Sequence, residues 1–381
     1  MVFNDIDKNA PSQTSVEQFT ELLRLSAPKL YWFRNRHLIE DGHIVVYGSV
    51  ASRDCPVADA PLVAKLAGRP VALDRMNTSE QLRNAFWYLP EEHVADIVIR
   101  APVDAVPDVT EGTDDSAYTD VELSLEGEEE FVANSSFALG YRYGEFARTP
   151  PTPSIERVSG KGATAYNYWN NGRTDFLRFS EIAERHGVET FNPSTRILDW
   201  GCGCARLTRH WMTSATDADK VVGIDIDPVN IEWCNSAFKN ASFEVCPLAP
   251  PANLKGPFDL IVGNSVLTHL KQDVMEAWLS ELAAQLKPNG VALLSYHGDF
   301  SLAAICSRNQ EFCERVYRTG FDASIGASEL NDAIDDKTYY RQTFMTDEFA
   351  QALFQREFTV KEVHVGVVSR YQNVAVLTPK T

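Results

Sequence analysis

The sequence predicts an α/β fold, with a doubly wound, mostly parallel sheet of seven strands preceded by a small, mainly-β domain. Apolar runs of strand length alternate with helix-forming segments from about residue 196 onward, which is typical of βαβ units. A Gly-x-Gly turn follows the first of these runs, and the second run ends in a carboxylate, Asp225. A chain of 381 residues is also long enough for two domains.

The first 150 residues have a different pattern from the rest. Residues 13–35 are expected to be helical, because apolar side chains recur there at roughly helical spacing. Short β-type runs then follow, separated by Pro, Gly and Asp, and they predict a small antiparallel sheet or sandwich. These runs are 43–48, 70–73, 93–100 and 118–125. We therefore predict an accessory domain, a helix plus β-rich part, over residues 1–150, and a proline-rich boundary at 148–153.

Residues 151–381 are expected to form the second domain. Its predicted strands are 196–200, 221–226, 242–246, 258–263, 290–296, 357–365 and 371–377, and its predicted helices are 205–213, 228–239 and 272–286. Asp227 followed by Pro228 is a favourable helix start, because an aspartate caps the free amides and proline suits the first helical position. The text Lys287-Pro-Asn-Gly290 is expected to end the last of these helices.

The glycine turn indicates a ligand site. Its glycines, Gly201 and Gly203, let the backbone pass close to a ligand, and Asp225 lies 24 residues after the first of them, near the spacing of roughly 20 expected for a ribose-binding acid. A dinucleotide-binding turn needs a third glycine, and Arg206 occupies that position. A nicotinamide or nucleotide-sugar enzyme is therefore disfavoured. The Walker pattern of phosphate-binding loops does not occur either.

Four ordered segments carry a resemblance to class I S-adenosylmethionine-dependent methyltransferases, over about residues 155–381. They are Leu198–Arg206, Gly223–Pro228, Phe258–Leu270 and Leu286–His297. The resemblance implies S-adenosylmethionine as the cofactor and a sheet closed by an antiparallel C-terminal hairpin. It also implies that Gly201, Cys202 and Gly203 form the cofactor loop, and that Asp225, followed by Ile226, accepts hydrogen bonds from the ribose hydroxyls.

The remaining cofactor contacts are expected along the same edge. Asp199 either orients the loop or meets the amino group of the methionine moiety, and Arg206 pairs either with the methionine carboxylate or with a loop carbonyl. Where the family often has an aspartate for the adenine amine, this chain has Cys246 and Pro247, so backbone groups there are expected to do that work. Asn264 ends the fourth strand, where cofactor and acceptor meet.

Two histidines are the candidate general bases. His297 directly follows the fifth strand, and strand C-termini carry the ligands of open α/β sheets. His269 opens a helix after the fourth strand, where a structural hydrogen bond to the backbone is the alternative. Tyr166 and Trp169 are expected either to contact the substrate or to pack between domains. Tyr340 lies in the long segment 299–346, which is expected to shape the acceptor pocket.

Composition narrows the class of partner. The formal net charge of −18 argues against nucleic acid and anionic lipid as partners. No apolar run is long enough to span a membrane, the N-terminus lacks the pattern of a signal peptide, and a cytoplasmic location is expected. The seven cysteines show no Cys-x-x-Cys, so we expect free thiols and no metal site.

These observations favour methyl transfer from S-adenosylmethionine to an oxygen of a saccharide or another small polar acceptor. An accessory domain that assists recognition or forms a homo-oligomer fits this function. The alternative is a non-catalytic S-adenosylmethionine-binding scaffold in which the β domain is the interaction module.

Overall fold

A computed structural model of the chain describes most of its residues. The described ranges are 29–66, 68–76, 86–103, 118–126, 133–138, 149–212, 220–239, 241–306, 308–369 and 371–380, with single positions at 17, 20, 21, 24, 25, 78 and 83. The side chains of 33–36, 118–120, 133–138 and 166 lie outside the description. The chain divides into two compact units. The accessory unit comprises 27–152 and 162–178, and the doubly wound unit comprises 153–161 and 179–381 together with the positions before 27.

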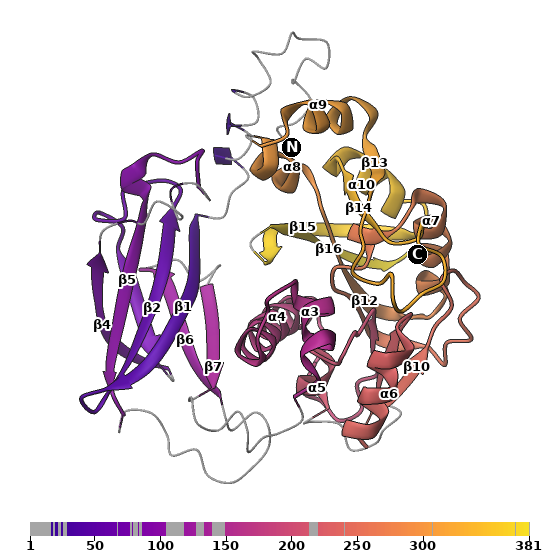
Figure 1. The fold of residues 1–381 in the computed structure, drawn as a ribbon, viewed down its shortest axis with the longest axis horizontal. Coiled ribbons are helices and arrows are strands. Elements are labelled where there is room, and N and C mark those ends of the chain that lie inside the picture. Colours follow the sequence, from indigo (N-terminus) through magenta and orange to yellow (C-terminus); the bar gives the residue numbers. More distant parts are fainter. Residues whose placement is uncertain are drawn as a thin grey trace. The chain divides into compact units, whose positions relative to one another are not determined.

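The accessory unit is built on a sheet of seven strands, all paired antiparallel (Figure 1). Its strands are β1 Leu30–Glu40, β2 His43–Ser52, β3 Leu62–Leu66, β4 Arg69–Met76, β5 Val94–Pro102, β6 Tyr118–Leu125 and β7 Ala133–Ala138, with the short helix η2 at Glu91–His93. They lie in the order β1-β2-β5-β4-β3-β6-β7. Most of the predicted helix 13–35 lies outside the described residues, but its last part is wrong, because Leu30 already begins β1.

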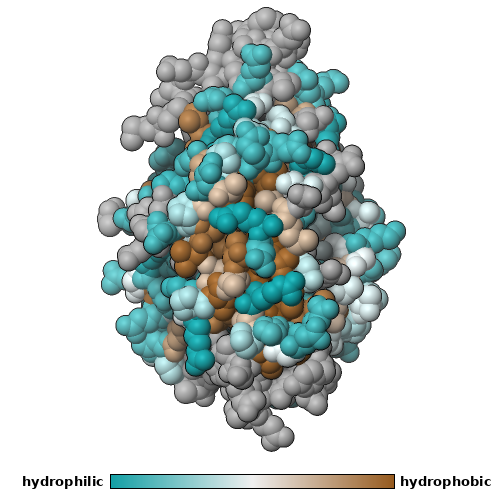
Figure 2. All heavy atoms as spheres, turned by 90° about the vertical axis from the view of Figure 1, so that its left-hand side faces the viewer, coloured by the Kyte–Doolittle hydropathy of each residue, from teal (hydrophilic) through white to brown (hydrophobic). Residues whose placement is uncertain are grey.

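The turn between β1 and β2 has a simple local cause. Asp41 and Gly42 both have positive φ, 49° and 71°, which is the conformation of a two-residue hairpin turn and the reason for the Asp-Gly pair there. Apolar residues of the strands, among them Trp32, Val46 and Ile97, form a core of their own. Figure 2 looks onto this unit and shows hydrophobic side chains gathered in the middle of the face among hydrophilic ones.

The doubly wound unit contains a second seven-stranded sheet, which confirms the predicted α/β fold. Its strands are β8 Ile197–Trp200, β9 Val221–Asp225, β10 Ser242–Val245, β11 Phe258–Gly263, β12 Leu286–Tyr296, β15 Phe358–Val368 and β16 Gln372–Pro379. The order is β10-β9-β8-β11-β12-β16-β15, in which the first five strands pair in parallel and β16 pairs antiparallel with both neighbours. The strand order reverses between β8 and β11, and ligands of open α/β sheets bind at the carboxyl edge of such a point.

Helices connect these strands, and two additional strands form a separate small sheet. The helices are α3 Thr152–Ser159, α4 Ala165–Arg185, α5 Thr208–Trp211, α6 Pro228–Ala237, η7 Leu267–His269, α7 Gln272–Ala284, α8 Asp299–Cys306, α9 Gln310–Thr319 and α10 Asp347–Phe354, and the two strands are β13 Phe321–Gly326 and β14 Arg341–Met345. As predicted, Asp227 caps α6, accepting a hydrogen bond from the Val229 amide at 2.9 Å. The helix predicted over 272–286 ends at Ala284, before Lys287–Gly290 as expected, but these four residues lie in β12 and not in a turn.

One face of the doubly wound sheet is covered by α7, α10 and part of the segment before α10. Leu198 and Trp200 are two apart on β8, and both belong to the buried cluster on this face. The centroid of the Trp200 ring lies 5.3 Å from that of Trp278 on α7. Leu353 of α10 and Tyr339 belong to the same buried cluster. The long insertion therefore packs onto the sheet beside its carboxyl edge, as part of the core. None of the helices in the described part of the chain is both long and apolar enough to cross a membrane.

Candidate functional site

The turn after β8 needs glycine at both predicted positions. Gly201 and Gly203 have φ of 74° and 54°, in the left-handed region that favours glycine. A Cβ on Gly201 would lie 2.4 Å from Cγ2 of Val266, and a Cβ on Gly203 would lie 2.5 Å from Cγ1 of Val158. The close approach in this structure is thus to protein side chains. Both glycines are fixed by packing as well as by backbone conformation.

Asp225 joins the turn to the end of β9. One carboxylate oxygen accepts the Gly203 amide and the other accepts the Asp227 amide, each at 2.8 Å. Burial raises the pKa of Asp225 to about 6, although these amide bonds favour the charged form. The Ile226 amide is a third backbone donor to this carboxylate, whose two oxygens offer about four lone-pair sites. The arrangement leaves an acceptor for a ligand hydroxyl, and Ile226 itself is half-buried.

Asp199 is hydrogen-bonded to the helix that follows the glycine turn. It is buried at the end of β8 and accepts a hydrogen bond from the Thr208 hydroxyl at 2.6 Å, which ties the strand to the start of α5. Burial raises its pKa to about 6. The half-buried Arg206 lies near enough for its charge to oppose this rise. Of the two roles predicted for Asp199, the loop-orienting one is supported by a direct contact.

The cysteines around the turn are packed as neutral thiols. Burial raises the pKa of Cys202 well above its ordinary value and the pKa of Cys204 to about 12. The sulfur of Cys204 faces the Ser154 carbonyl at 3.7 Å, and Cys234 faces the Gly203 carbonyl at 3.6 Å. All seven cysteines are free. These thiols fill space beneath the turn.

Some backbone groups of the segment predicted to bind adenine already form hydrogen bonds within the protein. The Cys246 amide donates to the Asp225 carbonyl at 2.9 Å. The Leu248 carbonyl accepts from the Tyr339 hydroxyl at 2.6 Å and from the Trp278 indole at 3.2 Å. Cys246 is buried and Pro247, which has no amide hydrogen, is exposed. Backbone recognition of adenine would therefore use the other polar groups of this segment.

Asn264 follows β11 at the carboxyl edge and is half-buried. Its neighbour Ser265 has a positive φ of 60° and donates its amide to the Ser295 hydroxyl at 2.7 Å. The Ser265 and Ser295 hydroxyls both donate to the Gln372 side chain, at 3.1 and 2.8 Å. This network connects the ends of β11 and β12 with the start of β16 and fixes the backbone that carries Asn264.

Both candidate bases are hydrogen-bonded to the backbone of the same strand, β14. The Nδ1 atom of His269 lies 2.7 Å from the Arg341 carbonyl, and that of His297 lies 2.9 Å from the Thr343 carbonyl. A carbonyl only accepts, so each Nδ1 carries the hydrogen, and Nε2 of the neutral ring is left as an acceptor. Arg341 and Thr343 are two apart on β14, so their carbonyls point to the same edge of that strand.

Burial keeps both rings neutral. It lowers the pKa of His269, and it lowers the pKa of His297 to about 3, with a smaller contribution from the nearby His269. His269 stacks on Tyr340 with ring centroids 4.0 Å apart, and His297 stacks on Phe344 at 4.5 Å. The sequence indicated the histidines, but it gave no sign of β14 as their common support.

The three aromatic residues predicted to contact the substrate have different surroundings. Half-buried Tyr340 belongs to the histidine cluster. Trp169 is 2 % exposed, and its indole donates to the Thr149 hydroxyl at 3.0 Å within the accessory unit. This contact accounts for Trp169 by packing within the accessory unit, and a contact with the substrate stays a prediction. The side chain of Tyr166 lies outside the description.

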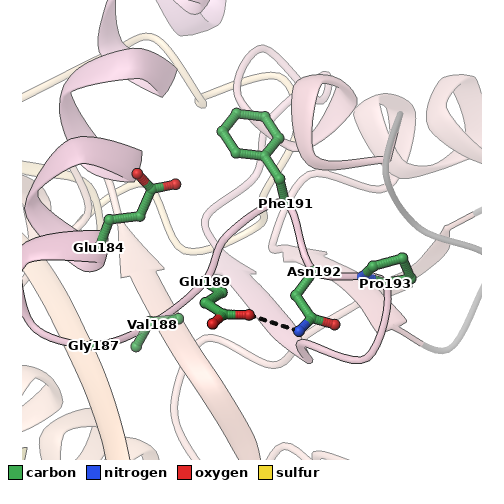
Figure 3. Close-up of a pocket in the computed structure, with 7 residues that line it drawn as sticks. All are labelled: Glu184, Gly187, Val188, Glu189, Phe191, Asn192 and Pro193. Atoms are coloured by element: carbon green, nitrogen blue, oxygen red, sulfur yellow. Dashed lines mark hydrogen bonds between the residues drawn. The ribbon is translucent and has the colours of Figure 1, made fainter.

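A pocket of about 760 Å³ lies away from these residues. Figure 3 shows its lining, which comes from the end of α4 and the loop that leads into β8: Glu184, Gly187, Val188, Glu189, Phe191, Asn192 and Pro193. Glu189 accepts a hydrogen bond from the Asn192 amide group at 2.8 Å. Because the lining precedes the first residue of β8, this pocket lies at the amino end of the strands. The candidate site lies at the carboxyl end.

Comparison with known proteins adds a family match. A family model described as a methyltransferase domain matches residues 197–290. Ribosomal protein L11 methyltransferases match over 137 residues; those from Burkholderia vietnamiensis and Paraburkholderia xenovorans are each 29% identical there, over 36% of this chain and 41% of the relative. The chain thus spans about two fifths of the length of these relatives.

Solved structures also align with this chain. A TehB-like SAM-dependent methyltransferase from Corynebacterium glutamicum is 19% identical, with a TM-score of 0.35, over 54% of this chain and 88% of that one. Magnesium protoporphyrin IX methyltransferase from Synechocystis, solved with S-adenosylhomocysteine, is 15% identical, with a TM-score of 0.38, over 59% of this chain and 91% of that one. At these scores the alignments carry no argument about the acceptor.

Proposed function

We propose that this chain, which carries a class I S-adenosylmethionine-dependent methyltransferase domain and has S-adenosylmethionine as its cofactor, methylates an oxygen atom of a saccharide or another small polar acceptor. The supporting observation is the pair of neutral histidines at the carboxyl edge, each with Nδ1–H bound to β14 and Nε2 left to accept a proton. A hydroxyl acceptor has a proton to lose, whereas orientation alone serves an acceptor that has none.

The residues that would hold the cofactor are those of the glycine turn and the end of β9. Gly201 and Gly203 shape the turn, Asp225 would accept the ribose hydroxyls, and Asn264 would stand between cofactor and acceptor. When bound, S-adenosylmethionine supplies an electrophilic methyl group on a sulfonium. The carboxylate of Asp225 is already oriented by two amides, so little ordering remains when the ligand binds.

The two histidines are suited to different tasks. A general base works best when its pKa is near the working pH. The pKa of His297 falls to about 3, which suits a hydrogen-bond acceptor that orients the hydroxyl. His269 is half-buried, and we propose it as the group that takes up the proton. Tyr340, stacked on its ring, would hold that ring in place and line the acceptor pocket.

Transfer of a labelled methyl group to a panel of acceptors tests this proposal. The panel contains neutral sugars, amino sugars, small polyols and ribosomal protein L11, the last because the matched relatives are named for it. We expect methylation of a hydroxyl compound, a rate reduced about 10²–10⁴-fold in His269→Ala, and a weaker loss in His297→Ala. Transfer only to an amine or to L11 would contradict the acceptor class. Cofactor binding without transfer to any acceptor would favour the non-catalytic scaffold.

A further inference from the structure

Three potential metal ligands lie close together within the doubly wound unit, and none of them is among the carboxyl-edge residues described above. Glu362 and His364 are two apart on the edge strand β15, so their side chains point to the same face. His186 follows the end of α4 and reaches the same place. Its Nε2 atom lies 2.7 Å from Oε1 of Glu362, and Nε2 of His364 lies 2.8 Å from that same oxygen.

The geometry suits a small cation in the middle of the three groups. One ligand atom from each residue lies within 4.8 Å of the others, so two imidazoles and a carboxylate are already gathered around one place. Two histidines with one carboxylate, and an open position for water, form a common zinc site. Imidazole nitrogen also favours zinc and its neighbours over magnesium or calcium.

The surroundings leave room for a fourth ligand. The side chain of His364 is 9% exposed, that of His186 21% and that of Glu362 44%, so the nitrogen ligands are sheltered while the carboxylate faces solvent. Two positive side chains are adjacent to the ligands along the chain: Arg185, which is bound to Glu181 at 2.6 Å, and Lys361. An open position on the solvent side is where a water molecule completes such a site.

We propose that His186, Glu362 and His364 bind one divalent transition-metal ion, with Zn²⁺ as the favoured ion and water as the fourth ligand. The ion would join the turn after α4 to the edge strand β15, two segments 176 residues apart in sequence. It would therefore act as a clamp between these two segments. The cysteine spacings predicted no metal site, and this ligand set contains no cysteine.

Titration of the full-length, tag-free and chelator-treated chain with Zn²⁺ in a calorimeter tests the proposal. We expect one ion per chain and at least about tenfold weaker binding in each of His186→Ala, Glu362→Gln and His364→Ala. His43→Ala is the matched control, since His43 is exposed in the accessory unit and contacts only the Asp41 carbonyl among its described hydrogen bonds. Its affinity for Zn²⁺ should equal that of the unmodified chain.

A second readout separates a metal site from a purely hydrogen-bonded trio. Co²⁺ substituted for Zn²⁺ should give the intense visible absorption of a four-coordinate centre, and Glu362→Gln, which keeps the size of the side chain, should abolish it. Thermal unfolding with and without Zn²⁺ should show stabilisation of the unmodified chain only. Absence of stoichiometric binding, or equal binding by the three variants and the unmodified chain, would overturn the proposal. None of these readouts depends on methyl transfer.

Discussion

The proposed cofactor side and the proposed acceptor side of the carboxyl edge are held together differently. At β8 and β9 the key contacts join residues close in sequence: Asp199 to Thr208, nine apart, and Gly203 to Asp225, 22 apart. On the acceptor side, His269 is held by a residue 72 positions away and His297 by one 46 away. Local contacts leave a spacing that can be recognised in a sequence. Contacts with a distant strand leave no such spacing, so the contacts of the two histidines with β14 could not be predicted from the sequence.

The largest effect is expected for the glycine turn. Gly203→Ala would bring a methyl group to 2.5 Å from Val158, adding overpacking of about 1–3 kcal/mol to the cost of left-handed backbone, about 1–3 kcal/mol. We expect a lower free energy of unfolding in urea and no measurable binding of S-adenosylhomocysteine. Gly160→Ala is the control, because Gly160 also has positive φ but a Cβ there meets nothing within 4 Å. Equal losses in both variants would show that packing at Val158 is unimportant.

A smaller effect is expected on the acceptor side, at Thr343 of β14. Its hydroxyl donates to the Leu270 carbonyl at 2.7 Å in a buried position. Thr343→Val leaves that carbonyl unpaired, at a cost of about 1–3 kcal/mol. Thr338→Val removes an exposed hydroxyl bound to Asp336 and should change the free energy of unfolding by less than about 0.5 kcal/mol. If both variants unfold alike, β14 is not the support that we describe.

The stacking of Tyr340 on His269 can be tested without knowing the acceptor. Burial is the main cause of the lowered pKa of His269. Tyr340→Leu removes a ring at 4.0 Å and admits water, so the pKa of His269 should rise towards its ordinary value of about 6.5. Nitrogen-resolved NMR titration of the histidines measures this directly. A pKa that stays unchanged or falls further would contradict the role assigned to the stack.

The smallest effect is a pH dependence on the cofactor side. The pKa of Asp225 is raised to about 6 in the folded chain, so the carboxylate is ionised above that pH and becomes protonated below it. Charge-assisted hydrogen bonds from ribose need the ionised form. S-adenosylhomocysteine binding should therefore weaken as the pH falls through about 6, with a shallower dependence in Asp225→Asn, because Asp199 titrates in the same range. Calorimetric titrations across this range would show equal slopes if Asp225 were not involved.

Much of the doubly wound unit followed from the sequence, because strand-length apolar runs and the Asp227-Pro228 helix start are local signals. The turn expected at Lys287–Gly290 is instead an irregular part of β12, between Leu286 and Val291, which both pair with β11. The same reasoning failed at Leu30, where a helical pattern was overruled by pairing with β2. β14 and the clamp of His186 with β15 depend on contacts between distant segments, so no local pattern indicates them.

Binding of S-adenosylhomocysteine to Asp225→Ala most directly tests whether an adenosyl cofactor is held by the glycine turn and the carboxylate after β9. Asp259→Asn is the matched control, since Asp259 pairs with Lys287 near the amino end of β11. We predict that the unmodified chain and the control bind the ligand equally and that NAD does not compete. Asp225→Ala should bind at least about tenfold more weakly, as expected for lost charge-assisted hydrogen bonds. Undiminished affinity in Asp225→Ala, or displacement of the ligand by NAD, would contradict the account.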